Sequence, residues 1–300
     1  MDHLDKTIIL DLVQNCRISY QSIAKKNGVS LNTIKKRIRS YLQDGIIEFS
    51  IEPHLANMDG DWAVAIVTAN GTEVPREFIE HLGNHDMINE VGPLSGGGYI
   101  IFAVYVGREG LSELATFLRT TEHVMKVEIH QVLIDRGKKV EFSRSELKIL
   151  RCLMDRPRMR LSKIADCTGY SAKTVRRGLQ RIIESNGIWF TVRLRLNAGN
   201  SLVFMARIEW NERKAKVQDV ITWLNTEFPV SHWIPLISVS EPIMYSVFVV
   251  DQVKEINPIL SQIKSQDFVQ SAISIMGTES YSFQDLRRKW LQDRILEVVS

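Results

Sequence analysis

The chain has 300 residues, of which 44% are hydrophobic and 24% charged, a composition that is typical of a folded protein and excludes intrinsic disorder. At roughly 150 residues per domain, the length allows two domains or four small ones. The net charge of +3 hides an alternation, because residues 1–50 carry +3, residues 51–139 carry −6, residues 140–195 carry +8 and residues 196–300 carry −2. The two basic segments are therefore expected to face polyanions.

Cysteine usage and hydropathy indicate a cytoplasmic protein. Cys16, Cys152 and Cys167 lie outside any C-x-x-C or Cys/His spacing, which excludes a disulfide scaffold and a zinc finger and fits a reducing compartment. No apolar run approaches the ~18 residues of a membrane span, and the charged start MDHLDK is not a signal peptide. We therefore expect a soluble, cytoplasmic chain with no membrane partner.

Residues 1–51 predict three helices and an extended segment. Apolar residues over 4–13 recur at helical spacing, and a short helix around Ile23 ends at the turn Asn27-Gly28. Ser30 caps a third helix, and Asp44-Gly45 then turns the chain into the extended residues 46–51. Two helices, a tight glycine turn, a third helix and a strand hairpin predict a winged helix-turn-helix.

Residues 60–137 alternate between strand and helix patterns. The expected elements are strand 63–68, helix 75–82, strand 87–91, strand 99–106, helix 111–118 and strand 127–134. This order, β-α-β-β-α-β, is that of a ferredoxin-like domain.

The second half of the chain repeats the first. Segments 23–25, 28–30 and 33–36 recur 141 residues later, and Gly45-Ile46 recurs at an offset of 142 as Gly187-Ile188. The second ferredoxin-like pattern comprises 202–209, 217–228, 233–237, 244–250, 256–263 and 272–276. We therefore predict an α+β fold, a tandem duplication of a winged helix-turn-helix followed by a ferredoxin-like βαββαβ domain.

The predicted boundaries follow from these patterns. They are winged helix-turn-helix domains at 1–52 and 140–195, ferredoxin-like domains at 60–137 and 200–280, and a C-terminal amphipathic helix at 282–300. That last helix, with its apolar and basic residues over 283–299, has no counterpart in the first copy and is expected to cover an interface.

Candidate DNA-binding residues lie on the third helix of each winged helix. A recognition helix needs short polar and basic side chains near its N-terminus, where base edges in the major groove lie within reach. The candidates are Ser30, Asn32, Thr33, Lys35, Lys36 and Arg39, and in the second copy Ser171, Lys173, Thr174, Arg176, Arg177 and Arg181. Flanking cations that could clamp phosphates are Lys25, Lys26, Arg158, Arg160 and Lys163.

The second recognition helix carries an irregularity. Gly178 stands where the first copy has Arg37, and we expect it to break the helix midway. The second copy would then bind DNA without sequence preference, through its larger positive charge.

The chain resembles the Lrp/AsnC family of feast/famine transcriptional regulators. The resemblance rests on Leu4-Asp5-x-x-Ile8-Ile9-x-x-Leu12, on Ser30-x-x-Thr33-Ile34-x-x-Arg37-Ile38 and on Asp44-Gly45-Ile46-Ile47. It extends over nearly the whole chain in two copies, and it is looser in the second winged helix and in the ferredoxin-like parts. It implies a sequence-specific DNA-binding regulator with double-stranded DNA as its partner.

The same resemblance implies a small-molecule effector near one loop. The family's effector loop is similar to Gly96, Gly97, Gly98 and Tyr99. Ile100 stands where the family usually has an aspartate suited to an amino group, which disfavours an amino-acid effector. A plain hairpin turn is the alternative interpretation of this glycine run.

No catalytic residues or metal ligands emerge from the sequence. His81 and His85 are four residues apart, but Gly83-Asn84 is expected to end their helix, and two ligands do not make a metal site. No Walker loop, nucleophile elbow or dinucleotide fingerprint is present. We therefore predict no enzyme, no cofactor and no metal.

Two alternatives and one assembly question stay open. Siroheme decarboxylases share this architecture and bind a tetrapyrrole between two such units, although they do not need basic recognition helices. A DNA-free interaction scaffold is the other alternative. As a regulator, the fused chain would form an intrachain pseudo-dimer, a homodimer or both.

Overall fold

The computed structural model describes residues 1–70, 76–95, 97–195, 201–277, 279–283 and 286–299. Its contacts divide the chain into two compact units, each of which gathers segments from both halves of the sequence. The sheet unit comprises Met1–His3, Asp61–Ile134 and Leu196–Gln284, and the winged-helix unit comprises Leu4–Gly60, Asp135–Arg195 and Asp285–Ser300. Like domains of the two copies are therefore grouped together.

The winged-helix unit contains two three-helix domains. The first consists of α1 (His3–Gln14), α2 (Tyr20–Lys26), α3 (Leu31–Gln43), β1 (Ile47–Pro53) and the short η1 (Leu55–Met58). The second consists of α6 (Arg144–Leu153), α7 (Leu161–Thr168), α8 (Ala172–Glu184) and β6 (Ile188–Leu194). In both domains the apolar stripe of each helix forms the core, with Ile8, Ile34 and Ile38 in the first and Ile149, Val175 and Ile182 in the second all buried.

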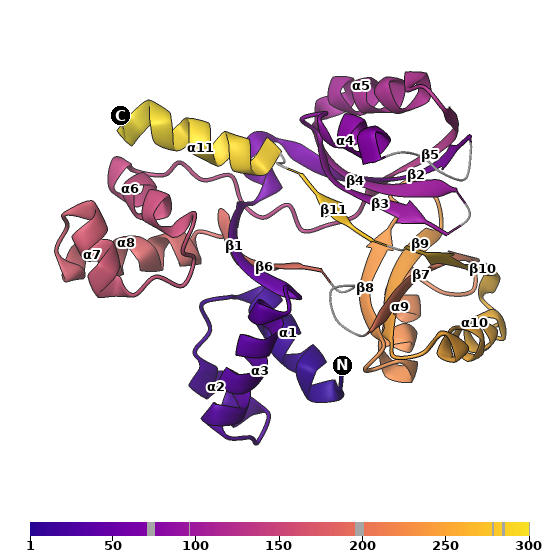
Figure 1. Cartoon of the computed structure of the whole chain (residues 1–300), viewed down its shortest axis with the longest axis horizontal. Helices are drawn as coiled ribbons and strands as arrows, with labels where there is room; N and C mark the ends of the chain where they lie inside the picture. The colour runs from indigo at the N-terminus through magenta and orange to yellow at the C-terminus, as the bar shows by residue number, and fades with distance from the viewer. Residues whose placement is uncertain (71–75, 96, 196–200, 278, 284–285, 300) are drawn as a thin grey trace. The chain divides into compact units, whose positions relative to one another are not determined.

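The strands of the two winged helices pair with each other and not within each domain. β1 and β6 form an antiparallel two-stranded sheet (Figure 1), and Ser50 lies opposite Thr191. These two residues are 141 positions apart, so the midpoint of the ladder relates the copies by a pseudo-two-fold axis. The strand hairpin predicted for each copy is therefore wrong, because each strand finds its partner in the other copy.

The turn before each strand shows that one pair of residues was matched wrongly in the predicted repeat. Gly45 has φ +67°, and Asn186, 141 residues later, takes the same left-handed conformation with φ +54°. The structural counterpart of Gly45 is therefore Asn186 and not Gly187. Asparagine tolerates the left-handed region better than most residues, which explains why the glycine could be replaced there.

A C-terminal helix completes the winged-helix unit. Helix α11 (Leu286–Val299) contacts α6, β1 and η1, and it buries Leu291 and Ile295. Its Arg287 lies 3.9 Å from the buried carboxylate of Glu52 on β1. The helix thus packs asymmetrically, on the second winged helix and the shared ladder.

The sheet unit contains two ferredoxin-like domains. The first consists of β2 (Gly60–Ala69), α4 (Arg76–Gly83), β3 (Ile88–Leu94), β4 (Gly98–Val106), α5 (Gly107–Thr120) and β5 (Val124–Val132). The second consists of β7 (Leu202–Trp210), α9 (Val217–Glu227), β8 (His232–Ile237), β9 (Ile243–Val250), η3 (Val253–Glu255), α10 (Ile256–Lys264) and β10 (Val269–Met276). These elements follow the predicted order, although Pro75, the predicted start of the first helix, lies outside the described residues.

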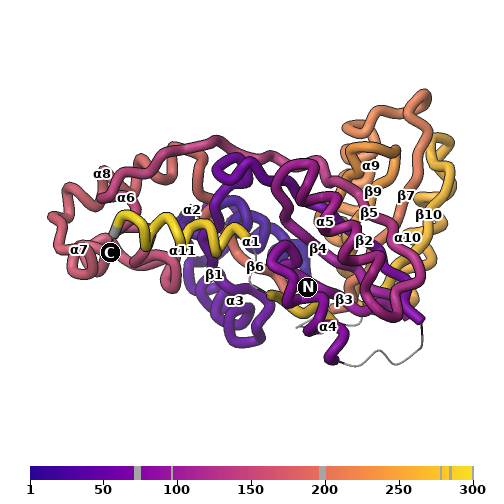
Figure 2. The backbone as a smooth tube through the Cα atoms, turned by 90° about the horizontal axis from the view of Figure 1, so that it is seen from above, coloured from indigo at the N-terminus to yellow at the C-terminus, as the bar shows by residue number. Residues whose placement is uncertain are grey.

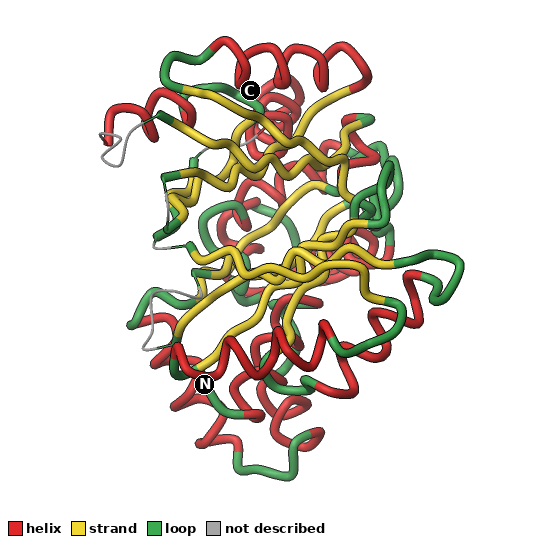
Figure 3. Tube along the Cα trace, turned by 90° about the vertical axis from the view of Figure 1, so that its right-hand side faces the viewer, coloured by secondary structure: helices red, strands yellow, loops and turns green. Residues whose placement is uncertain are grey.

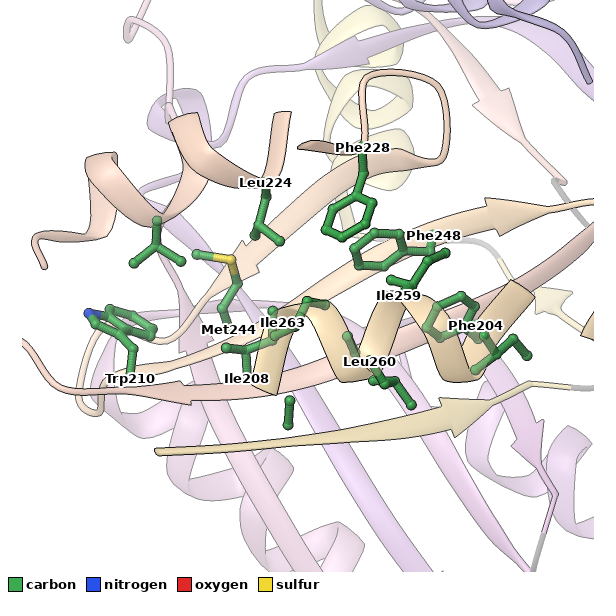
Figure 4. Packing of buried hydrophobic residues seen from close by; sticks show 14 of the residues in the cluster. Phe204, Ile208, Trp210, Leu224, Phe228, Met244, Phe248, Ile259, Leu260 and Ile263 are labelled. Carbon is green, nitrogen blue, oxygen red and sulfur yellow. The ribbon is translucent and has the colours of Figure 1, made fainter. Parts of the chain in front are cut away.

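The sheets have related strand orders. The second runs β10-β7-β9-β8, and the first runs β11-β3-β4-β2-β5, with the unpredicted strand β11 (Tyr281–Ser282) added beside β3. In the second domain, α9 and α10 lie against the strands (Figure 2) and close an apolar core in which Phe204, Phe228 and Phe248 pack together (Figure 4).

The two sheets of this unit pack face to face. In Figure 3 their strands form inner layers with helices outside. Val64, Ile100 and Val132 from the first sheet contact apolar residues of the second, including Met205 and Val247. Backbone bridges join the sheets at both edges, between Leu94 and Gly277 and between Val132 and Ser238. The apolar contacts between the sheets bury the inner face of each sheet, which would be exposed to water if the sheet were alone.

Two further observations bear on the predictions from composition. Cys152 and Cys167 form a disulfide, a pairing that the spacing of the cysteines did not predict. Their separation of 15 residues gave no sign of it, because only the packing of α6 against α7 brings them together. No helix in the described part of the chain has the length and apolar character that a membrane crossing requires.

Candidate nucleic-acid interface

Helix α3 presents a polar and basic face. The turn at Gly28, with φ +63°, leads to Ser30, whose hydroxyl accepts a hydrogen bond from the Thr33 backbone N–H at 3.0 Å. This cap fixes the start of the helix, and the apolar stripe beneath it is buried. The predicted residues left exposed on the helix are Asn32, Lys35, Lys36 and Arg39.

Helix α8 repeats this construction. Gly169 has φ +73°, and the Ser171 hydroxyl accepts a hydrogen bond from the Thr174 N–H at 3.2 Å. The predicted residues left exposed on this helix are Lys173, Thr174, Arg176, Arg177 and Arg181. The structure therefore presents the same helical face twice, with more positive charge in the second copy.

Gly178 does not break the second helix. Helix α8 runs without interruption from Ala172 to Glu184. A Cβ atom on Gly178 would lie 2.6 Å from Ile149 Cδ1, so the missing side chain lets α8 approach α6 closely. In the first copy Arg37 occupies this position and forms an ion pair with Asp5 on α1. The predicted break is wrong, and the glycine is explained by helix packing.

Several predicted cations have partners within the protein. Arg181 Nε lies 3.4 Å from Glu146 Oε1, although 61% of the Arg181 side chain stays exposed. Lys26 pairs with Asp11 at 2.5 Å, and Lys163 pairs with Asp166 at 3.3 Å. Lys26 and Lys163 also stay largely exposed, at 58% and 72%, so these ion pairs leave the cations within reach of phosphate, as are the exposed Lys25 and Arg160.

Arg158 has a structural position that the sequence analysis did not foresee. Its guanidinium donates to the backbone carbonyls of Cys16 and Ile18 and lies 4.3 Å from the centre of the Tyr20 ring. Arg17 does the reverse, donating to the carbonyls of Pro157 and Met159. The two arginines are 141 residues apart, so each clamps the segment that surrounds its own counterpart. That offset was readable from the repeat, and it is the signal by which the pair could have been found.

The two arginines and their reciprocal hydrogen bonds are called here the Arg17–Arg158 clamp. The third cysteine, Cys16, lies next to this clamp, since its carbonyl accepts a hydrogen bond from Arg158. Cys16 is fully buried, and burial raises the pKa of its thiol to about 11. Burial likewise lowers the pKa of Arg17 from its ordinary value. Cys16 is therefore a protonated core residue at neutral pH.

The predicted effector loop divides into different environments. Gly96 lies outside the described residues, and Tyr99 is buried in the first domain's core, with its ring 5.1 Å from that of Phe78. Gly98 borders a cavity of about 210 Å³ between the sheets. The residues that line this cavity are Ile66, Val67, Thr68, Leu94, Ser95, Gly98, Ser274, Ile275 and Met276. None of these side chains is charged.

A charged cluster lies between the two sheets at the junction formed by β5, away from the cavity beside Gly98. Glu128 accepts hydrogen bonds from Arg207 at 3.0 Å, from Tyr245 at 2.9 Å and from His130 at 3.0 Å. Burial opposes ionisation of Glu128, but these three donors outweigh it and hold its pKa at about 2. The cluster joins β5 to β7 and β9 and so stabilises the packing of the two sheets.

The histidine pair considered for a metal lies against an aromatic ring. Helix α4 ends at Gly83, between His81 and His85, and their rings lie 5.6 Å and 4.3 Å from that of Phe117. Within the described ranges, no three histidine, cysteine or carboxylate side chains gather as metal ligands.

Comparisons with known proteins agree with this geometry. Residues 1–48 match the family model described as winged helix-turn-helix DNA-binding. An uncharacterized HTH-type transcriptional regulator from Pyrococcus furiosus is 34% identical and covers 39% of this chain and 79% of its own length. The HTH-type transcriptional regulator LrpA from Pyrococcus horikoshii is 30% identical and covers 37% of this chain and 78% of its own length.

Solved structures of one enzyme match over the whole chain. The siroheme decarboxylase NirDL has a TM-score of 0.56 and 13% identity, and it covers 100% of both chains. This match contradicts the prediction that the chain is no enzyme, because an enzyme shares its fold along the full length. At this identity the likeness shows the fold alone.

Proposed function

Because the chain belongs to the Lrp/AsnC family of helix-turn-helix transcriptional regulators, we propose that its two winged helices bind one DNA duplex as an intrachain pseudo-dimer. The observation that carries this proposal is the pair of matched recognition helices, α3 and α8. Each is capped by a serine after a left-handed glycine, and each exposes basic side chains on the same face. The function is that of a DNA-binding regulator, and the two halves would read unlike half-sites.

The shared ladder and the arginine clamp support the intrachain arrangement. The β1–β6 pairing is centred on Ser50 and Thr191, and Arg17 and Arg158 make reciprocal contacts. Both features are isologous contacts, of the kind that two separate subunits would make across a two-fold axis. A single chain would then bind an imperfect palindrome, with half-site centres about 34 Å apart or a multiple of that distance.

Charge distribution supports a division of contacts between the copies. The second winged-helix segment carries +8 and the first carries +3. We propose that Asn32, Lys35, Lys36 and Arg39 supply sequence preference, while Lys173, Arg176 and Arg177 add a larger share of phosphate contacts. Each phosphate contact strengthens the salt dependence without selecting a sequence.

A small-molecule effector at the cavity beside Gly98 is a further part of this proposal. The residues that line the cavity include Thr68, Ser95 and Ser274, which carry hydroxyl groups, and the others are apolar. A zwitterionic amino acid would require charged partners, which this lining does not provide. An uncharged ligand of a few heavy atoms suits the cavity better.

The test of the proposed function is binding to genomic DNA fragments, including the protein's own promoter, across a salt series. We expect tight, fragment-selective binding with a steep dependence on salt concentration. Weak and unselective binding at every salt concentration would reject the proposal, and a fragment bound selectively would supply the operator.

A tetrapyrrole decarboxylase is a second candidate, favoured by the full-length fold match to siroheme decarboxylase NirDL. The cavity between the sheets argues against this candidate. Its volume of about 210 Å³ is below the ~300–1,000 Å³ of typical sites for drug-sized ligands. An absorbance scan of the purified protein tests this candidate directly. Visible bands after addition of siroheme, together with loss of its carboxylates, would favour the enzyme.

A further inference from the structure

The disulfide of the second winged helix has a counterpart in the first. Cys152 on α6 and Cys167 on α7 correspond, at the offset of 141, to Asp11 on α1 and Lys26 on α2. Asp11 and Lys26 form an ion pair at 2.5 Å, and the Asp11 side chain is only 7% exposed. The same two helices are thus linked at the same place in both copies, by a covalent bond in one and by an ion pair in the other.

This link matters more in the second copy because α7 has little apolar anchorage. Ile164 is the buried residue of α7, whereas α2 buries both Ile23 and Ala24. Helix α7 is the first helix of the helix-turn-helix, and it leads through Gly169 into the recognition helix α8. Its attachment to α6 therefore affects how firmly α8 is held.

The two cysteine residues differ in their access to solvent. Cys167 is exposed, whereas Cys152 is buried with 8% of its surface accessible. Because Cys167 is the more exposed residue, its Sγ is the atom that we take a thiol from solution to attack, with Cys152 as the leaving group. The third cysteine, Cys16, is fully buried and does not compete in this exchange.

We propose that Cys152 and Cys167 form a reversible thiol–disulfide site that sets the rigidity of the second winged helix alone, with low-molecular-weight thiols and disulfides as its reaction partners. The first winged helix, linked by the Asp11–Lys26 ion pair, keeps its rigidity at every redox state. The structure thus gives one chain a redox-sensitive and a redox-insensitive helix-turn-helix.

The exchange balances with two small thiols. The thiolate of the first attacks Cys167 Sγ and breaks the disulfide, which leaves a mixed disulfide on Cys167 and a Cys152 thiolate that takes a proton from water. The second thiolate attacks the small-molecule sulfur of the mixed disulfide, releases Cys167 as a thiolate and forms the small disulfide. The two electrons that reduce the protein disulfide come from the two small thiols, and the reverse sequence restores it.

Hydrogen exchange of the full-length chain in buffers of reduced and oxidised glutathione tests the proposal. Mass spectrometry after alkylation reports the state of each cysteine in the same samples. In the reduced buffer we expect backbone amides of α7 to exchange roughly tenfold faster or more, because the constraint on the opened state is removed. The amides of α2 should keep their rate and serve as the internal control.

Two variants sharpen the result. Cys152→Ser/Cys167→Ser should exchange like the reduced protein in either buffer. Cys152→Asp/Cys167→Lys places the first copy's ion pair in the second, and its α7 should exchange at one intermediate rate in both buffers. Alkylation of both cysteines in the oxidised buffer, or an α7 rate that is the same in both buffers for the unsubstituted protein, would overturn the proposal.

A DNA measurement extends the proposal and rests on the proposed function. Reduction should lower DNA affinity and the salt slope of the unsubstituted protein and leave those of the Asp/Lys variant unchanged. If no DNA binds under any condition, the proposed function fails while the exchange experiment still decides the thiol–disulfide site. If DNA binds equally well in both buffers although α7 loosens, the extension to DNA is wrong.

Discussion

The two winged helices keep the same backbone while using different side chains for the same contacts. Both have a left-handed glycine and a serine cap before the recognition helix, at positions 141 residues apart. Where the helices touch, the pairs differ, because Asp11–Lys26 in the first copy is a disulfide in the second. Similarly, Arg37 contacts Asp5 in the first copy, while Gly178 admits Ile149 in the second.

This comparison separates two kinds of constraint on a duplicated domain. Backbone geometry limits which residue types can stand at caps and turns, because few residues accept left-handed φ values or satisfy free N–H groups. Contacts between helices can be met by an ion pair, a covalent bond or close packing, so they diverge. The exposed face is free of both constraints, and there the copies differ in charge.

The largest expected effects come from changing that exposed face. Asn32→Ala/Lys36→Ala should reduce discrimination between operator and random DNA by about 1–3 kcal/mol for each side chain that no longer reaches a base.

Arg176→Ala/Arg177→Ala should weaken binding to all sequences and reduce the salt slope by about two, one for each phosphate that is no longer neutralised. Quantitative binding to operator and random duplexes over a salt series measures both effects.

A matched control for these variants is Lys264→Ala, which removes an exposed lysine from α10 in the sheet unit. It should leave affinity, discrimination and salt slope unchanged. If the α3 variant keeps full discrimination while the α8 variant loses it, the assignment of sequence preference to the first copy is reversed.

The next largest effects concern the Arg17–Arg158 clamp. Arg158→Ala removes donors to the carbonyls of Cys16 and Ile18 and a cation that lies over Tyr20, and it should cost about 2–4 kcal/mol in the free energy of unfolding. Arg17→Ala should cost less, about 1–3 kcal/mol, because its ring contact with Phe190, at 5.9 Å, is longer than both ring contacts of Arg158, with Tyr20 at 4.3 Å and with Phe49 at 5.4 Å.

Chemical denaturation of the full chain measures both changes in stability, and the exposed Arg160→Ala is the control. Equal destabilisation by the Arg17 and Arg158 variants would show that the ring contacts of Arg158 with Tyr20 and Phe49 add nothing beyond the contact of Arg17 with Phe190. A destabilisation no larger than that of the control would show that the reciprocal hydrogen bonds do not hold the two winged helices together.

The fold could be predicted largely because its signals are local. Helical spacing over residues 4–13, the turn at Gly28 and the alternation of strands and helices over 60–137 all depend on neighbouring residues. The parts that were missed join distant residues. The β1–β6 ladder, strand β11 beside β3 and the Cys152–Cys167 disulfide all depend on tertiary contacts that carry no local pattern.

The candidate site divides in the same way. The exposure of Asn32, Lys36 and Arg176 followed from helical periodicity. The partner of Arg158 did not, because a basic residue beside a recognition helix suits a phosphate and a backbone carbonyl equally well. Only the structure distinguishes these two uses of the same charge.

A smaller effect is expected from a buried lysine in the first copy. Lys6 is 7% exposed, and burial lowers its pKa to about 8, whereas its counterpart 141 residues later is the buried Leu147. Lys6→Leu should raise the free energy of unfolding by about 1–2 kcal/mol at pH 7, because a buried charge is replaced by an apolar side chain.

The pH dependence provides a second readout for Lys6. The unfolded chain binds this proton up to about pH 10.5 and the folded chain up to about pH 8, so stability rises between these values. Lys6→Leu should remove that rise, whereas the exposed Lys25→Leu should keep it. A variant no more stable than the unsubstituted protein, with the rise intact, would show that Lys6 is well solvated.

The smallest expected effect contrasts the two junctions between the sheets. Strand registers place Ile66 beside Glu128 and Arg207 beside Ile273, so the duplication puts isoleucines at one junction where the other has the Arg207–Glu128 ion pair. The pKa of Glu128 is about 2 when folded, against an ordinary value of 4.5, so its stabilisation is complete above pH 4.5 and is lost as the pH falls toward 2.

Glu128→Gln should lower the free energy of unfolding at pH 7 by on the order of 1 kcal/mol, since part of the side chain is screened by water. It should also flatten the loss of stability between pH 4.5 and 2, which denaturant titrations at a series of pH values would measure. Glu122→Gln, whose side chain is 89% exposed, should leave that slope unchanged, and an equal change of slope in both variants would mean that general charge, and not the junction, governs the acid response.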